Sequence, residues 1–591
     1  MTSTPLISQN STPLLTLATR PAGSRRPWVL LIDITVMLFV FAVIFGIYTI
    51  GRSWLGPATP GAHISQSPRA LPLYALYSLV RIGVAYALSL IFALAYGYIA
   101  ANSRRAEMIL IPLLDILQSI PVLSFLPGVM LAMVALFPQR QIGAELGSIL
   151  LIFTGQVWNI AFSFYSSLKT EPRELKEAAR IYRFGNWQRF AQLDLPFSTI
   201  GLVWNSMMSV AGGWFFLMAC EMFVLGNRDF RLPGLGSFLQ TAAGNGDTRA
   251  ILYGLAAMIG VIVLLDQLIW RPIIVWADKF KFEQVQVAKS KPSTLLQIVG
   301  RAAVVIRMYR FLVRPVINRL TLSFASGARK AGVSLSGAKR RLSLSWFAAI
   351  FGTVVLAGIG IAVFQGVREL SGLHHQDYFA LLRSASLTFL RVNAALLLGA
   401  LWTVPVGVAI ASNPRLSKIA QPLVQLAASI PATALFPVLL LFLIHLHWGV
   451  EIAAMLLMLL GTQWYILFNV IAGAMAVPTD LKEVARIFCF TSWDRWRYLT
   501  LPAIFPYLVT GMITASGGAW NASIIAEYFH FQGRIVSAPG LGSTISRASD
   551  SGRFDLLLAS TLIMATIVVL MNRIIWRRLY RLASSRFKLE T

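Results

Sequence analysis

The chain has 591 residues, of which 57% are hydrophobic and only 13% are charged, and its mean hydropathy is +0.68. Soluble globular domains carry roughly 25% charged residues, so this composition excludes an ordinary soluble protein and favours a membrane protein. The formal net charge of +27 does not indicate nucleic-acid binding. The Lys and Arg residues gather at the ends of apolar runs and in one connecting segment, as the positive-inside bias and attraction to anionic membrane lipid predict.

Apolar runs long enough to cross a bilayer, which takes about 20 residues per helix, occur six times in each half of the chain. In the first half we expect spanning helices over residues 29–50, 74–101, 108–137, 146–168, 197–226 and 250–277. In the second half we expect them over residues 346–367, 381–411, 417–444, 450–475, 503–530 and 554–580. The predicted fold class is therefore an all-α membrane protein with about twelve spanning helices.

Lys and Arg are concentrated in the connections at 102–107 and 169–195, in the segment 278–345 and in the C-terminal tail. The positive-inside bias places these segments and both termini in the cytoplasm. Apolar positions alternate with arginines between 294 and 325, which predicts either an amphipathic helix on the inner leaflet or a solvated tether.

The apolar runs and the basic segment between them divide the chain into three parts. Residues 1–284 form a first unit, residues 285–345 form a basic cytoplasmic linker, and residues 346–591 form a second unit.

The second unit repeats the first. Residues 174–187 and 480–493 are identical at 8 of 14 positions at an offset of 306, and the same offset pairs the two Pro-Gly-Leu-Gly segments at 233–236 and 539–542. Nearer the start of each unit the offset is 310, which pairs Arg81 with Arg391. Six helices return the chain to its starting side, so the units are parallel repeats. They are expected to be related by a pseudo-twofold axis along the membrane normal, with substrate passing between them.

A polar, helix-patterned segment lies between the fourth and fifth predicted helices of each unit, at 172–196 and 478–502. Each segment contains a short helix, a break at Gly185 or Thr491, and then Asn186 or Ser492 as the N-cap of a second short helix. We therefore predict two short cytoplasmic helices in each unit.

These segments resemble the cytoplasmic loop of the inner-membrane components of binding-protein-dependent ABC importers. That loop has the form Glu-Ala-Ala, a Gly six residues after the Glu, and then Ile-x-Leu-Pro. The Glu and the Pro are 19 residues apart in both copies here, whereas the Gly position holds Arg183 and Cys489. Gly185 is available to supply the turn in the first copy. The residues assigned to coupling are Glu177, Ala178, Ala179, Gly185, Pro196, Glu483, Val484, Ala485 and Pro502.

The resemblance covers nearly all of both units and implies a type I importer-like permease with its two subunits fused in one chain. It implies two copies of a separate ABC ATPase as partners, which bind ATP and Mg and dock on the coupling helices, and an extracytoplasmic substrate-binding protein. The chain itself has no phosphate-binding Gly-x-x-x-x-Gly-Lys-Ser/Thr loop. No catalytic residue, metal site or cofactor is expected in it. The implied location is the bacterial inner membrane.

Within the family, Gly212-Gly213-Trp214, Glu221 and the following Pro-Gly-Leu-Gly resemble the nitrate, sulfonate, taurine and bicarbonate permeases. This resemblance implies a small anion as the substrate.

Ionisable residues inside membrane helices usually face a cavity or a partner. Arg81 and Arg391 recur in the second predicted helix of each unit, and Glu221 and Glu527 recur in the fifth. Three readings stay open for them: attraction of an anion near the axis, structural Arg–Glu pairs, or arginines that extend to the outer membrane interface. Four residues of the fourth helices either line a polar path or pack between helices: Gln156, Trp158, Gln463 and Trp464.

A secondary transporter is the main alternative, because such transporters also contain internal repeats. The duplicated docking motif distinguishes the two classes, since a secondary transporter has no use for it. A membrane scaffold or sensor is a further alternative, against which the repeated intramembrane charges argue.

Overall fold

The computed structural model describes residues 64–280 apart from 139, 226 and 227, residues 364–586, and the single positions 54, 353, 357, 360 and 361. The predicted helix at 29–50, most of the one at 346–367 and the linker 285–345 lie outside the described residues. Among the described residues, one compact unit contains 171–200 and 265–280, and a second contains the remainder. The first predicted boundary, at 284, and the second, at 345, stay predictions.

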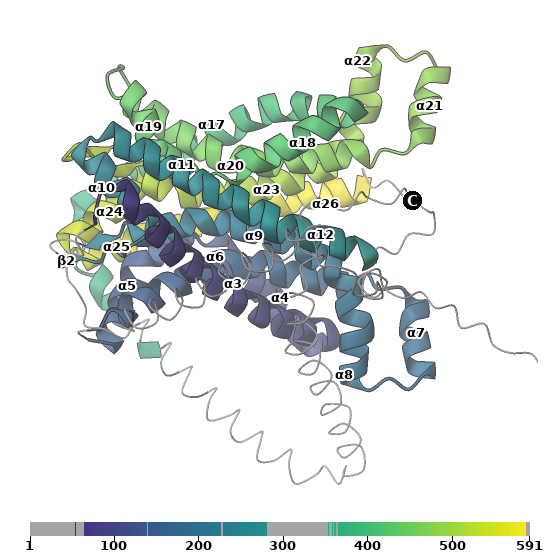
Figure 1. The fold of residues 1–591 in the computed structure, drawn as a ribbon, viewed down its shortest axis with the longest axis horizontal. Coiled ribbons are helices and arrows are strands. Elements are labelled where there is room, and N and C mark those ends of the chain that lie inside the picture. Colours follow the sequence, from purple (N-terminus) through teal and green to yellow (C-terminus); the bar gives the residue numbers. More distant parts are fainter. Residues whose placement is uncertain are drawn as a thin grey trace, which may run out of the picture. The chain divides into compact units, whose positions relative to one another are not determined.

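Long apolar helices make up most of the described chain (Figure 1). The first half contains α3 (Leu71–Asn102), α4 (Arg104–Ser119), α5 (Leu126–Leu136), α6 (Ile142–Lys169), α9 (Leu195–Glu221), α10 (Leu235–Asn245), α11 (Thr248–Leu265) and α12 (Arg271–Ala277). The second half contains α17 (His375–Ser412), α18 (Pro414–Ser429), α19 (Ala432–Leu443), α20 (Gly449–Met475), α23 (Leu501–Ala526), α24 (Leu541–Ser551), α25 (Phe554–Met571) and α26 (Arg577–Arg586). Within the described residues, 8 helical segments are long and apolar enough to span a membrane, which confirms an all-α membrane fold.

The repeat extends to irregular details of the helices. A π-helical turn at Asp266–Trp270 joins α11 to α12, and one at Asn572–Trp576 joins α25 to α26, at the offset of 306 seen in the sequence. The packing of α3 against α6 likewise recurs as the packing of α17 against α20.

The third predicted helix of each unit is broken rather than continuous. In the second half, the segments Arg415–Ser429 and Ala432–Leu443 meet at 83°. Ile430 has ψ 118° because the ring of Pro431 excludes helical geometry from the preceding residue. The first half breaks at the equivalent place, where Ile120 has ψ 130° before Pro121.

The fifth predicted helices are shorter than expected. They end at Glu221 and Ala526, and a β-hairpin follows in each half: β1 (Val224–Leu225) with β2 (Arg228–Asp229), and β3 (Tyr528–Phe531) with β4 (Arg534–Ser537). Gln532 and Gly533 have φ values of 49° and 70°, as the tight turn of the second hairpin requires. The prediction of helix as far as 226 and 530 was wrong, because a short apolar strand and an apolar helix end look alike in sequence.

Candidate translocation pathway and coupling segments

The first predicted coupling segment forms α7 (Arg173–Ile181), a short α8 (Asn186–Arg189) and a π-helical turn (Phe190–Asp194). Glu177 is exposed, Ala178 is half-buried and Ala179 is buried, so α7 has a free face and a packed face. The chain turns at Arg183, whose φ is 50°, and the Phe184 N–H donates to the Ala179 carbonyl over 2.9 Å.

The second coupling segment repeats this geometry in α21 (Thr479–Ile487) and α22 (Ser492–Asp494), which project beyond the long helices of the second half in Figure 1. Glu483 and Val484 are exposed and Ala485 is buried. Cys489 has φ 52°, and the Phe490 N–H donates to the Ala485 carbonyl over 3.0 Å. The Pro that ends each motif, Pro196 or Pro502, lies half-buried in the first turn of α9 or α23.

The position at which the family has Gly is therefore left-handed in both copies, although it holds Arg183 and Cys489. Gly185 does not supply the turn, because its φ is not positive. The N-cap of α22 is Thr491 rather than Ser492, and its hydroxyl accepts from the Asp494 N–H over 3.2 Å.

Cys489→Gly is expected to stabilise the second coupling segment. A left-handed conformation costs an L-residue roughly 1–2 kcal/mol. Gly avoids this cost but loses more backbone entropy on folding, so the net stabilisation is about half of that figure. Amide hydrogen exchange of residues 479–494 should therefore slow roughly two- to fivefold. Cys489→Ala keeps the Cβ atom and should leave exchange unchanged; equal slowing in both variants would mean that the thiol, not the backbone, is responsible.

Both coupling segments expose the same pair of large apolar positions. Ile181 and Tyr182 are 78% and 75% exposed, and the equivalent Ile487 and Phe488 are 76% and 70% exposed. Exposed apolar side chains on an otherwise polar surface indicate a site for a protein partner.

The first coupling segment has two buried carboxylates, Glu171 and Asp194, whereas the second has Val477 and Thr500 at the equivalent positions. The Glu171 carboxylate lies 3.7 Å from Arg189 and 3.8 Å from Lys176, and Arg189 also pairs with Asp194 over 3.3 Å. Burial, with the neighbouring Asp194 charge, raises the pKa of Glu171.

A buried ion-pair network surrounds Arg81 on α3. Its Nε and Nη2 atoms donate to the two oxygens of Glu145 over 2.6 and 2.8 Å. Its Nη1 atom donates to Glu221 over 2.7 Å and to the Pro233 carbonyl over 2.7 Å. The Arg81 side chain is fully buried, so this geometry favours the structural reading of the Arg81–Glu221 pair.

The Glu221 carboxylate also explains the Pro-Gly-Leu-Gly segment that follows it. It accepts hydrogen bonds from the Ser78 hydroxyl and from the Gly236 N–H, each over 2.7 Å, and so anchors the N-terminus of α10. A Cβ atom at Gly234 would overlap this carboxylate. The Pro-Gly-Leu-Gly segment therefore holds the short helix α10 against the end of α9.

The second half contains the same arrangement, with one carboxylate fewer around its arginine. Glu527 accepts from Arg391, from Thr388 over 2.8 Å and from the Gly542 N–H over 2.8 Å. Glu451 stands where the first half has Glu145, but across the described residues it forms no ion pair with Arg391. Arg391 is accordingly 9% exposed, whereas Arg81 is fully enclosed.

The four predicted path residues of the fourth helices have different environments. Gln156 is buried, and its amide finds no hydrogen-bond partner among the described residues. Gln463 accepts from the Trp402 indole over 3.2 Å. Trp158 is half-buried, and Trp464 borders a cavity of about 120 Å³ together with the equivalent pair Gly212 and Gly518.

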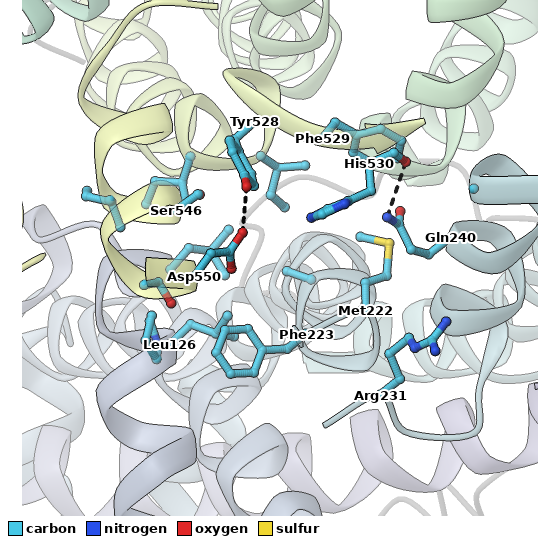
Figure 2. A pocket seen from close by; sticks show the side chains of 18 of the residues that line it. Leu126, Met222, Phe223, Arg231, Gln240, Tyr528, Phe529, His530, Ser546 and Asp550 are labelled. Carbon is cyan, nitrogen blue, oxygen red and sulfur yellow. Dashed lines mark hydrogen bonds between the residues drawn. The ribbon is translucent and has the colours of Figure 1, made fainter. Parts of the chain in front are cut away.

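A larger cavity of about 330 Å³, here called the axial cavity, lies at the C-terminal ends of α9 and α23 (Figure 2). Equivalent positions from the two halves line it, at the offset of 306: Ala219 and Ile525, Met222 and Tyr528, Phe223 and Phe529, Gln240 and Ser546, Gly244 and Asp550. Both repeats therefore contribute equivalent positions to the cavity, as is expected of a pathway that the two halves share.

Hydrogen bonds join the two halves where α10 meets the β3–β4 hairpin. The Gln240 amide donates to the His530 carbonyl over 3.4 Å, as Figure 2 shows, and the Gln532 N–H donates to the Ala243 carbonyl over 2.9 Å. The β3–β4 hairpin of one half is thus attached to the α10 helix of the other.

The sequence pattern of the family described as binding-protein-dependent transport system inner membrane component matches residues 93–269 and 403–588. The chain belongs to this family. The two matches lie in the first and second predicted units, so one chain contains two copies of the permease pattern. This confirms the resemblance drawn from the coupling motif.

Known permeases resemble this chain at modest identity. A nitrate import permease of Leptolyngbya laminosa is 24% identical over 185 residues, which is 31% of this chain and 63% of the relative. A taurine transport system permease of Escherichia coli is 26% identical over 200 residues, or 33% of this chain and 68% of the relative. A bicarbonate transport system permease of Synechococcus elongatus is 31% identical over 143 residues, or 24% of this chain and 49% of the relative. Each alignment covers about half to two thirds of the relative and a third or less of this permease.

Sequence reasoning missed Glu145 and the polar residues of the axial cavity in this permease. Glu145 falls just outside the predicted helix 146–168, and its recurrence as Glu451 at the offset of 306 was the signal that could have identified it. Tyr528, His530 and Asp550 lie in a hairpin and a short helix that the sequence did not predict. For the cavity residues, the available signal was that Asp550 breaks the repeat, since the equivalent residue is Gly244.

Proposed function

We propose that this permease is the transmembrane component of an ATP-driven ABC importer and that it provides both halves of the translocation pathway in one chain. The observation that carries the proposal is the duplicated coupling segment. Two copies present the same exposed Glu, the same buried Ala and the same exposed apolar pair. One chain with two such surfaces suits two copies of an ATPase subunit.

In this proposal the partner ATPase binds ATP and Mg, and its opening and closing moves the coupling helices as rigid bodies. An extracytoplasmic binding protein delivers the substrate at the opposite face. Both termini are cytoplasmic, in keeping with the Lys- and Arg-rich connections. The inner membrane of a bacterium is the proposed location.

We further propose a small anion as the substrate, because the similar permeases are named for nitrate, taurine and bicarbonate. The pathway would run between α9 and α23, past Trp464 and through the axial cavity. The helices that would surround this pathway carry Gln156, Trp158 and Gln463. The Arg81–Glu221 and Arg391–Glu527 pairs would hold the outer ends of the pathway helices rather than contact the solute.

Uptake of labelled nitrate, bicarbonate, ethanesulfonate, taurine and a cationic amino acid in cells with and without the gene tests this proposal. At least one anionic substrate should lose most of its uptake without the gene. A protonophore should leave the gene-dependent uptake intact while ATP depletion removes it. Loss with the protonophore at constant ATP would instead indicate a secondary transporter, and loss of the cation alone would contradict an anionic substrate.

A further inference from the structure

The smaller cavity of about 120 Å³, here called the inner cavity, is lined by residues of α9, α20 and α23. The described residues that line it include none with a charge. Residues of α9 and α23 also line the axial cavity, at the C-terminal ends of both helices. Because α9 begins directly after the first coupling segment, the inner cavity lies on the cytoplasmic side of the axial cavity along the same pair of helices.

One side chain, Tyr465 of α20, lies between α9 and α23 at the inner cavity. A Cβ atom built on Gly212 of α9 would lie 3.5 Å from the Tyr465 hydroxyl, and one built on Gly518 of α23 would lie 3.6 Å from its ring. These two glycines are equivalent positions of the repeat, at the offset of 306. Tyr465 has no counterpart there, because the equivalent residue Asn159 is exposed and does not line the cavity.

The repeat is also broken beside Tyr465. In the first half, a Cβ atom at Gly155 would overlap the Phe216 ring, so that ring fills the space next to α6. The equivalent residues of the second half, Gly461 and Ala522, both line the inner cavity. An aromatic ring is therefore absent where the first half has one, and the open space that results is bordered by Tyr465.

The hydroxyl of Tyr465 is available to a solute. Across the described residues it has no hydrogen-bond partner, although a tyrosine that is buried only for packing usually has one. It is directed toward Gly212, on the helix of the other half. A movement of α9 away from α23 would therefore separate Gly212 from the hydroxyl without breaking a hydrogen bond.

We propose that Tyr465 is the selectivity constriction of this permease, the ring past which every solute moves and which limits the size of that solute. Tyr465 acts in the importer pathway proposed above, on which this inference rests. An apolar cavity of about 150 Å³ holds benzene, so the inner cavity of about 120 Å³ beside Tyr465 admits a solute no larger than a small ring. The axial cavity, at about 330 Å³, imposes no such limit.

Thiol labelling tests this role without a known substrate. Met208 lines the inner cavity four residues to the cytoplasmic side of Gly212, and Met222 lines the axial cavity on its outer side. The experiment uses the intact importer, with both native cysteines replaced by Ala, and adds sulfonatoethyl methanethiosulfonate, a membrane-impermeant anion, from outside. Met208→Cys should react slowly while Tyr465 is present, and Tyr465→Ala should speed this reaction roughly tenfold or more. Tyr465→Phe keeps the ring and should leave the reaction slow.

Further variants distinguish the constriction from a general loosening of the fold. Tyr465→Leu retains an apolar side chain and should give an intermediate rate, which also covers the case in which Tyr465→Ala fails to accumulate. Met222→Cys lies outside the constriction and should react at the same rate whichever residue occupies position 465. Asn159→Ala changes the equivalent residue of the first half, so it is the matched control and should leave the labelling of Met208→Cys unchanged.

Two results would overturn the assignment of Tyr465. Rapid labelling of Met208→Cys with Tyr465 in place, or equal rates with Tyr, Leu and Ala at position 465, would show that the ring does not close the pathway. An unreactive Met222→Cys would show that the axial cavity does not open to the outside. Labelling requires neither ATP nor a transported solute, so it decides the role of Tyr465 whether or not the uptake experiment supports the importer function.

Discussion

Reversal of both coupling glutamates, Glu177→Lys with Glu483→Lys, is expected to remove the ATPase from the purified complex. Both side chains are exposed on helices whose opposite faces are packed. A charge reversal at a docked surface places like charges together, which costs several kcal/mol, so ATPase retention should fall more than about tenfold. Co-purification from detergent, quantified as the molar ratio of ATPase to permease, is the measurement.

The single variants provide the control for this experiment. Glu177→Lys alone or Glu483→Lys alone leaves one coupling segment intact, so each single variant should co-purify with a reduced amount of ATPase. The permease itself should remain monodisperse in both. Full retention in the double variant would exclude these helices as the docking surface. Complete loss in one single variant would mean that the two copies are not equivalent and that only one of them anchors the ATPase.

Apolar runs predicted the long helices well because membrane-spanning helices are defined by length and hydrophobicity. The predicted spans 74–101 and 450–475 correspond closely to α3 and α20. The repeat also suggested Arg–Glu pairs between the second and fifth helices as one open reading, and the described residues contain both pairs.

Features that depend on tertiary structure could not be predicted in this way. The short helices α10 and α24 have 11 residues each, too few to stand out from an apolar loop. Only Glu527 separates the segment Tyr528–Phe531 from an apolar helix, and no Gly or Pro marks the boundary in the sequence, so the two-residue period of the strand could not be recognised. Glu145 completes the network only because α6 packs against α3. The left-handed turns at Arg183 and Cys489 break the local preference for Gly and show up only in the backbone.

The network around Arg81 is expected to be the most sensitive point of the fold. Arg81→Met would leave two buried carboxylates, Glu145 and Glu221, without their counter-charge. Loss of one partner from a buried ion pair typically costs about 3–5 kcal/mol, so the variant should unfold at a clearly lower temperature in detergent or fail to accumulate. Arg391→Met leaves only Glu527 unpaired and should be less damaging.

A double variant decides whether the charge or the packing of Arg81 matters. Arg81→Met with Glu145→Gln removes one of the two unpaired carboxylates. One unpaired carboxylate then remains, as in Arg391→Met. If uncompensated charge causes the damage, the double variant should recover thermal stability toward that of Arg391→Met. If Arg81 acts mainly through the shape and packing of its guanidinium group, the second substitution should bring no recovery, and Arg81→Lys, which keeps the charge but not that shape, should be destabilised nearly as much as Arg81→Met. Thermal unfolding of the four variants and the wild-type permease in one detergent separates these cases, because each predicts a different order of melting temperatures.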